Sequence, residues 1–133
     1  MTGVGRRLKA ERPGVRILAV EPYPGSQLQG LRSLEEAYNP SLLDYSVLDG
    51  KILVRSVHAF RAGRLLLQQE GIFAGASSGA VLHGALRWAR RMKKGKIVML
   101  FADAGWKYLD SPLFDGSLPN EDESEELDDI LWW

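Results

Sequence analysis

Residues 96–101 read Lys-Ile-Val-Met-Leu-Phe, and this run constrains the fold more than any other stretch. An apolar run without the alternation of a half-exposed strand is typical of a strand buried on both faces. Shorter strand candidates are residues 16–21, 51–57 and 72–76. A sheet built from such strands needs helices packed on both of its sides.

Helical spacing separates these strand candidates. Residues 4–12 predict a helix that stops at Pro13-Gly14, and a second helix is expected from near Ser56 to a stop at Gly71. A third begins at residues 77–79 and extends to Gly95, with apolar residues on one face. Residues 22–46, rich in Pro, Gly, Ser and Asn, predict an irregular loop with one short helical turn.

This alternation predicts an α/β fold, a partial three-layer α/β/α domain with a mostly parallel sheet. Ligands of such sheets bind at the carboxyl ends of the strands. Two turns follow predicted strands there, residues 76–79 (Ala-Ser-Ser-Gly) and 102–105 (Ala-Asp-Ala-Gly). A site is expected at these turns.

Charge and composition narrow the class of protein. The 133 residues fit one ordinary domain, and 17 basic residues balance 17 acidic ones, which argues against a nucleic-acid binder. Basic residues gather in 6–16 and 87–96, and acidic ones in 121–129. Solvated helix faces and a solvated tail are the simplest interpretation.

Other classes of site are disfavoured. The chain has no cysteine, and its two histidines, His58 and His83, are far apart in sequence, so no metal site is expected. No apolar run approaches the roughly 18 residues that span a bilayer. The first residues lack the apolar stretch of a signal peptide, so a cytoplasmic protein without a membrane partner is expected.

The serine pair Ser77-Ser78 has two interpretations. A serine between a strand and a helix commonly caps the helix. Alternatively, one hydroxyl faces a ligand while the other caps.

Residues 70–83 (Glu-Gly-Ile-Phe-Ala-Gly-Ala-Ser-Ser-Gly-Ala-Val-Leu-His) resemble the signature of pyridoxal-phosphate-dependent cysteine synthases. These are fold type II enzymes of the tryptophan-synthase-β-like superfamily. The resemblance implies pyridoxal 5'-phosphate as cofactor and β-replacement on an amino-acid substrate to form L-cysteine. It also implies that Ser77 hydrogen-bonds the pyridine nitrogen, as a neutral partner that does not hold a proton on the ring.

Residues 105–109 (Gly-Trp-Lys-Tyr-Leu) are similar to a narrower branch, the O-phosphoserine sulfhydrylases, although Asp110 departs from the serine usual there. The branch takes sulfur from a thiocarboxylated sulfur-carrier protein. O-acetylserine remains the alternative substrate. In this branch an arginine in the stretch matching residues 28–32 recognises the substrate phosphate, which implies that role for Arg32; otherwise Arg32 is a solvated loop residue.

The tail is similar too, since acidic residues precede Leu131-Trp132-Trp133. In the branch the tail covers the mouth of the active site; the alternative is a tail packed on its own domain or on a partner subunit. We expect residues 1–114 to be the C-terminal portion of a catalytic domain and 115–133 an acidic tail. A homodimer is expected of the full-length enzyme.

The chain start matches the family just after its phosphate-binding glycine loop, at Gly3-Val4-Gly5-Arg6. The six lysines lie mostly in exposed-looking contexts and none matches the Schiff-base lysine, so no catalytic residue is predicted. The isolated chain is expected to be inactive. A catalytically inactive remnant or interaction fragment is therefore the alternative function. A serine or threonine dehydratase is a third possibility, which residues 105–109 disfavour.

Overall fold

The computed structural model describes residues 1–26, 28–34, 40–115, 117 and 130–132. Its elements are, in chain order, α1 (Thr2–Glu11), β1 (Leu18–Pro22), the 3₁₀ turn η1 (Tyr45–Val47), β2 (Gly50–Val54), α2 (Ser56–Glu70), α3 (Ala76–Ala89), the 3₁₀ turn η2 (Gly105–Tyr108) and β3 (Ile130–Trp132). The three helices and the first two strands were predicted, as was one helical turn in the loop before β2.

The described sheet has the strand order β1-β2-β3. β1 and β2 are parallel, in register from Leu18 opposite Gly50 to Pro22 opposite Val54. β3 is antiparallel to β2, with Trp132 opposite Gly50. The end of the tail therefore adds an edge strand to its own domain, at the amino-terminal half of β2. Residues 118–129 lie outside the described part of the chain.

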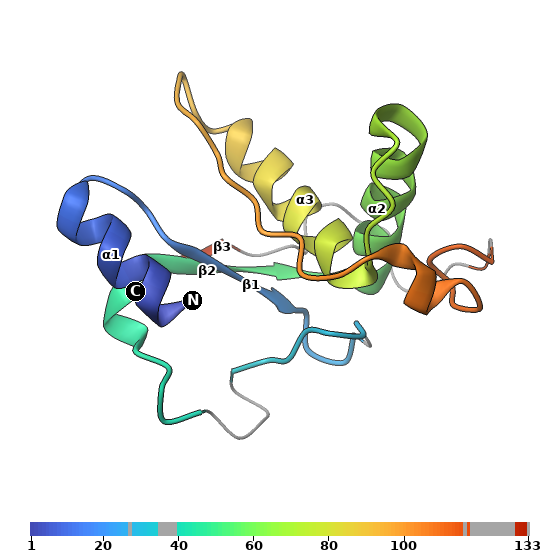
Figure 1. The fold of residues 1–133 in the computed structure, drawn as a ribbon, viewed down its shortest axis with the longest axis horizontal. Coiled ribbons are helices and arrows are strands. Elements are labelled where there is room, and N and C mark those ends of the chain that lie inside the picture. The colour runs from blue at the N-terminus through green and yellow to red at the C-terminus, as the bar shows by residue number, and fades with distance from the viewer. Residues whose placement is uncertain (27, 35–39, 116, 118–129, 133) are drawn as a thin grey trace.

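The sheet is covered on both faces. α2 and α3 lie on one face (Figure 1), where Leu18 and Val20 of β1 join Ile52 and Val54 of β2 in one hydrophobic cluster. Gly84 of α3 packs there, since a Cβ atom on it would lie 3.4 Å from Ile52.

The opposite face carries a smaller cluster. Ala19 points there because side chains alternate along a strand, and it packs with Ile17, Val47 and Leu48. Gly5 of α1 lies against Val47, 3.2 Å from the position of a Cβ atom. The α/β class is thereby confirmed.

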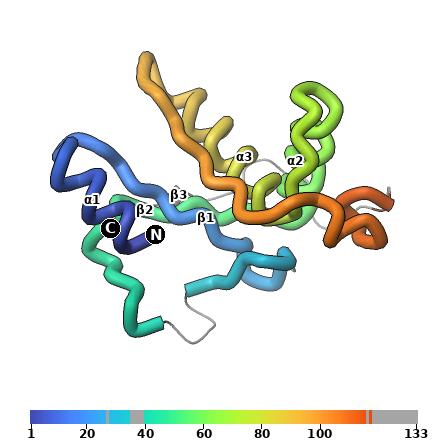
Figure 2. The backbone as a smooth tube through the Cα atoms, viewed as in Figure 1, coloured from blue at the N-terminus to red at the C-terminus, as the bar shows by residue number. Residues whose placement is uncertain are grey.

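Two predicted strands are wrong. Residues 72–76 contribute only an isolated bridge between Ala74 and Ala104, and residues 96–101 form no strand with any described segment. Figure 2 shows residues 96–101 as an extended stretch beside α3. Val98 is 94% exposed and Leu100 81% exposed. An apolar run becomes a strand only when another strand offers its edge, and none of the described strands does so for this run.

The predicted end of α2 is confirmed, whereas the predicted end of α3 is wrong. Gly71 ends α2 in the left-handed conformation (φ 68°), as predicted. α3 ends at Ala89, before the predicted stop at Gly95, and Arg91 and Met92 continue only as turns. Among the described residues, no helix has the length and apolar character needed to cross a membrane.

Candidate functional site

Three segments resemble the family in sequence: residues 28–32, 70–83 and 105–109. These three motif segments meet at the carboxyl ends of β1 and β2. β1 leads into the loop that contains residues 28–32, and β2 leads into α2. α3 runs back over the sheet, because Ala76 packs in the cluster with Val54 while Gly84 lies against Ile52, further back along β2. The first turn of α3 therefore stands at the end of the sheet where α/β folds bind ligands.

Ser77 and Ser78 lie inside this first turn and do not cap it. Gly75 is the N-cap residue, and no side chain caps the helix, so capping by either serine is ruled out. Ser77 is 6% exposed and Ser78 1% exposed. The buried hydroxyl oxygen of Ser78 has no hydrogen-bond partner among the described residues.

Gly75 allows the second turn to reach the start of α3. A Cβ atom there would lie 2.3 Å from Oδ1 of Asp103 and 2.5 Å from the ring of Tyr108, so any other residue would displace these two side chains. The backbone N–H groups of Gly75 and Gly105 donate to the carbonyl groups of Asp103 and Phe73, at 3.1 and 3.0 Å. The turns predicted from sequence as separate candidates thus form one structure.

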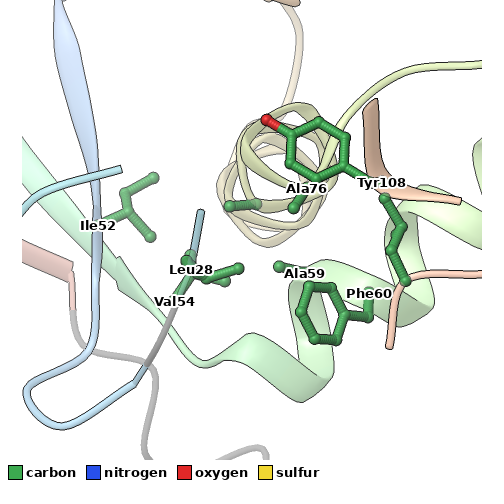
Figure 3. Close-up of a cluster of buried hydrophobic side chains, with 9 residues drawn as sticks. Leu28, Ile52, Val54, Ala59, Phe60, Ala76 and Tyr108 are labelled. Atoms are coloured by element: carbon green, nitrogen blue, oxygen red, sulfur yellow. The ribbon is translucent and has the colours of Figure 1, made fainter. Parts of the chain in front are cut away.

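The loop that carries Arg32 reaches the same place through Gly30. Gly30 has φ +88°, and a Cβ atom on it would lie 3.6 Å from both Ser77 Oγ and Tyr108 Oη. Leu28 anchors the loop in the main hydrophobic cluster, which also contains Tyr108 and Ala76 (Figure 3). Arg32 follows Gly30 by two positions, is exposed, and makes no hydrogen bond or ion pair with a described residue.

Asp103 and Tyr108 form a pair whose roles sequence reasoning missed. The Tyr108 hydroxyl donates a 2.7 Å hydrogen bond to Oδ2 of Asp103, and Lys107 Nζ lies 3.8 Å from the same oxygen. This hydrogen bond, together with burial, raises the pKa of Tyr108 to about 12. The five-residue spacing across a 3₁₀ turn is the only sequence signal that could have suggested the pair.

Two side-chain arrangements in the structure were not predicted from the sequence. Lys51 is not exposed: its side chain is 3% exposed and its Nζ lies 3.5 Å from Oε2 of the equally buried Glu21. Its ammonium group is thus engaged by a carboxylate. His58 and His83 are stacked, with ring centroids 4.8 Å apart, because α2 and α3 pack together. No described group of three or more His, Cys, Asp or Glu side chains could hold a metal ion.

Residues 1–103 match the family described as pyridoxal-phosphate dependent enzyme. The chain belongs to this family. It is 38% identical over 117 residues to a cysteine synthase of Aquifex aeolicus, covering 84% of this chain and 36% of the relative. It is 35% identical over 132 residues to an O-ureido-L-serine synthase of Streptomyces lavendulae, covering 93% and 41%. The chain thus spans about two-fifths of the length of these relatives.

Solved structures of the family have the same fold. An O-ureido-L-serine-bound mutant of O-ureido-L-serine synthase is 36% identical with a TM-score of 0.77, covering 91% of this chain and 40% of that one. A cysteine synthase from Entamoeba histolytica is 27% identical with a TM-score of 0.76, covering 84% and 36%. The family's cofactor is pyridoxal 5'-phosphate.

The chemistry of this region suits the pyridine ring of that cofactor. Ser77 offers a neutral hydroxyl at the ligand-binding end of the sheet. The nearby carboxylate of Asp103 already accepts a hydrogen bond from Tyr108 and lies close to the ammonium group of Lys107. A serine hydroxyl of this helical turn is thus chemically suited to a ring nitrogen that carries no proton.

Proposed function

We propose that this chain is part of a cysteine synthase, which catalyses β-replacement on O-phosphoserine or O-acetylserine with a sulfur donor to form L-cysteine. One observation carries the proposal. Ser77, the Gly30 loop and the turn of Asp103 and Tyr108 converge at the carboxyl ends of the parallel strands. These are the segments whose sequences resemble the cysteine synthases, and two of the relatives above are named cysteine synthases.

The proposed role of Ser77 is to hold and orient the cofactor ring. A serine hydroxyl can donate to an unprotonated pyridine nitrogen, whereas a carboxylate would stabilise a proton there. When bound, pyridoxal phosphate supplies the electron delocalisation that allows the substrate's β-substituent to leave. Ser77 sets how strong that delocalisation is.

The proposed role of Arg32 is to select the substrate. A guanidinium group can donate two parallel hydrogen bonds to a phosphate, and it carries its charge at every physiological pH. Arg32 is exposed and follows Gly30 by two positions, and a Cβ atom on Gly30 would lie 3.6 Å from Ser77 Oγ. We therefore propose O-phosphoserine as the preferred substrate. A thiocarboxylated sulfur-carrier protein, a homodimeric assembly and a cytoplasmic location belong to this proposal through the resemblance alone.

A chimera tests these roles in a complete protein. Residues 1–133 would replace the matching part of the Aquifex aeolicus cysteine synthase, and cysteine formation would be measured with sulfide and either substrate. We expect turnover of O-phosphoserine. Arg32→Gln should lower kcat/KM for O-phosphoserine about tenfold or more and change that for O-acetylserine by less than about twofold.

The controls keep binding and chemistry apart. Arg7→Gln, on the exposed side of α1, should leave both substrates unaffected. Ser77→Ala should shift the cofactor's absorbance and fluorescence. A chimera that folds and binds pyridoxal phosphate but makes cysteine from neither substrate contradicts the proposal.

The isolated chain is a separate case, since none of its six lysines matches the family's Schiff-base position. We expect no cysteine from the purified 133-residue chain with pyridoxal phosphate, sulfide and either substrate. A heat-denatured sample gives the background rate. Cysteine formation above that background would show this expectation to be wrong.

A further inference from the structure

A second cluster of charged side chains lies between α2 and α3. Of its residues only His83, the last residue of the 70–83 segment, belongs to a segment that resembles the family. The cluster surrounds a cavity of about 300 Å³. α2 contributes His58 and Arg61, α3 contributes His83 and Arg87, and Arg90 follows directly after the end of α3. The other three residues that line the cavity are apolar, and no described lining residue is acidic.

Helical spacing brings these residues into one site. Arg61 follows His58 by three positions, and Arg87 follows His83 by four, so each pair lies on one face of its helix. The stacked rings of His58 and His83 join the two faces, with centroids 4.8 Å apart and planes 14° apart. Gly79 allows this, because it lets the backbones of α2 and α3 approach closely.

We propose that this cavity binds a compact oxyanion, the phosphate group of a small molecule. Guanidinium groups from two helices can hold several phosphate oxygens at once through paired hydrogen bonds. The volume lies at the small end of ligand sites, and the apolar lining suits a molecule with a small uncharged portion.

The two histidines make a direct test possible. They are the only two in the chain and both line the cavity, so the imidazole region of a ¹H–¹⁵N spectrum reports on this site alone. Inorganic phosphate and pyrophosphate would be titrated into the full chain at constant ionic strength. We expect both imidazole signals to shift saturably, with calorimetry giving the same Kd.

Matched variants separate a site from general positive charge. Arg61→Gln/Arg87→Gln should weaken binding about tenfold or more, since both remove a donor fork at the cavity. Arg91→Gln/Lys94→Gln removes equal charge near the end of α3 outside the lining and should change Kd less than about twofold. Equal weakening by the two variants would overturn the proposal. Circular dichroism would confirm that each variant is folded.

The experiment must also control for the chain's own acidic residues, which compete with added phosphate for cationic side chains. Residues 121–129 include seven acidic residues in the sequence. The titration would therefore be repeated on a chain in which those seven are replaced by Gln and Asn. Binding that depends on Arg61 and Arg87 in either chain supports an oxyanion site, and the difference in Kd measures the competition. Absence of saturable shifts in both chains overturns the proposal of an oxyanion site.

Discussion

Gly79 lies where α3 passes directly against the backbone of α2. A Cβ atom at this position would lie 2.1 Å from the carbonyl oxygen of Ala59 and 3.0 Å from the amide nitrogen of Gly63. Both obstacles are backbone atoms, which cannot move aside without separating the helices. The contact also sets the distance between His58 and His83, and it holds the first turn of α3, with Ser77, at the end of the sheet.

Replacing Gly79 with alanine should therefore be costly. We expect Gly79→Ala to lower the free energy of unfolding by about 3 kcal/mol or more, which is the upper part of the range for overpacked cores. Urea denaturation would measure it. Gly3→Ala is the matched control, because nothing lies within 4 Å of that position and α1 should gain up to about 1 kcal/mol from the better helix former. Similar stability of the two variants would contradict the close approach.

The hydrogen bond from Tyr108 to Asp103 predicts that the stability of the fold decreases at high pH. It is the main reason that the pKa of Tyr108 is raised from 10.0 to about 12. A raised folded-state pKa means that the contribution to stability is complete below pH 10, the unfolded value, and is lost as the pH rises through about 12. Absorbance titration should show the late ionisation of Tyr108, with a pKa of about 12.

Tyr108→Phe isolates this effect. We expect it to remove the late titration and to cost about 1–3 kcal/mol at neutral pH, because Asp103 loses a partner while its Oδ1 is already buried without one. Tyr45→Phe, at a half-exposed position, should leave both the titration and the stability nearly unchanged. If the late ionisation persists in Tyr108→Phe, the pairing is wrong.

At the scale of elements, α1 is attached to the sheet through Asp49, which precedes β2. Lys9 of α1 donates to Oδ1 of Asp49 at 2.8 Å, and the backbone N–H of Ile17 donates to Oδ2 at 2.7 Å. Burial raises the pKa of Asp49, but the hydrogen bonds from Lys9 and Ile17 outweigh it, so the net pKa is lowered. One carboxylate thus joins the helix, the start of β1 and the start of β2.

Asp49→Asn should lower the free energy of unfolding by about 1 kcal/mol at neutral pH, since the amide oxygen replaces only part of this network. The folded-state pKa is depressed, so the wild-type advantage should be present above the ordinary value of 3.8 and vanish as the pH falls through the lower folded value. Arg7→Gln disrupts an exposed ion pair with Glu11 and should cost almost nothing. A pH-independent difference for Asp49→Asn would contradict the role of its charge.

Elements with local signals were predictable from the sequence, and elements that depend on a distant partner were not. Gly71 ends α2 because its own φ angle allows it. By contrast, residues 96–101 have the composition of a strand but no described strand beside them, and Ile130–Trp132 became a strand because β2 had a free edge. Ser77 was correctly predicted at the start of a helix. The approach of the Gly30 loop to Ser77 and the pairing of Asp103 with Tyr108 depend on three-dimensional folding, which spacing alone does not encode.

At the scale of the whole molecule, residues 96–101 leave apolar surface in water. Val98 and Leu100 are almost fully exposed, and Ile97, Val98 and Met99 line a groove of about 600 Å³ with residues of α1, β1 and α3. Extended apolar segments with free backbone groups readily pair with other chains. The isolated chain should therefore associate with itself as its concentration rises.

Val98→Lys/Leu100→Lys should reduce this association, because charged residues on an open strand edge oppose pairing. Sedimentation velocity over a range of concentrations would measure it, with circular dichroism to confirm folding. Leu42→Lys, at another exposed apolar position outside the groove, is the matched control and should leave association unchanged. A chain that stays monomeric at high concentration without these changes would contradict the expectation.

The antiparallel pairing of β3 with β2 also affects how the chain folds during its synthesis. Translation makes Val54, the last residue of β2, 76 residues before Ile130, the first residue of β3. At roughly 5–20 residues per second, the ribosome needs about 4 to 15 s for that interval. During it α2 and α3 are made as well, and β3 is not yet there to pair with the outer edge of β2. In the cell this interval is when chaperones have most reason to bind the newborn chain.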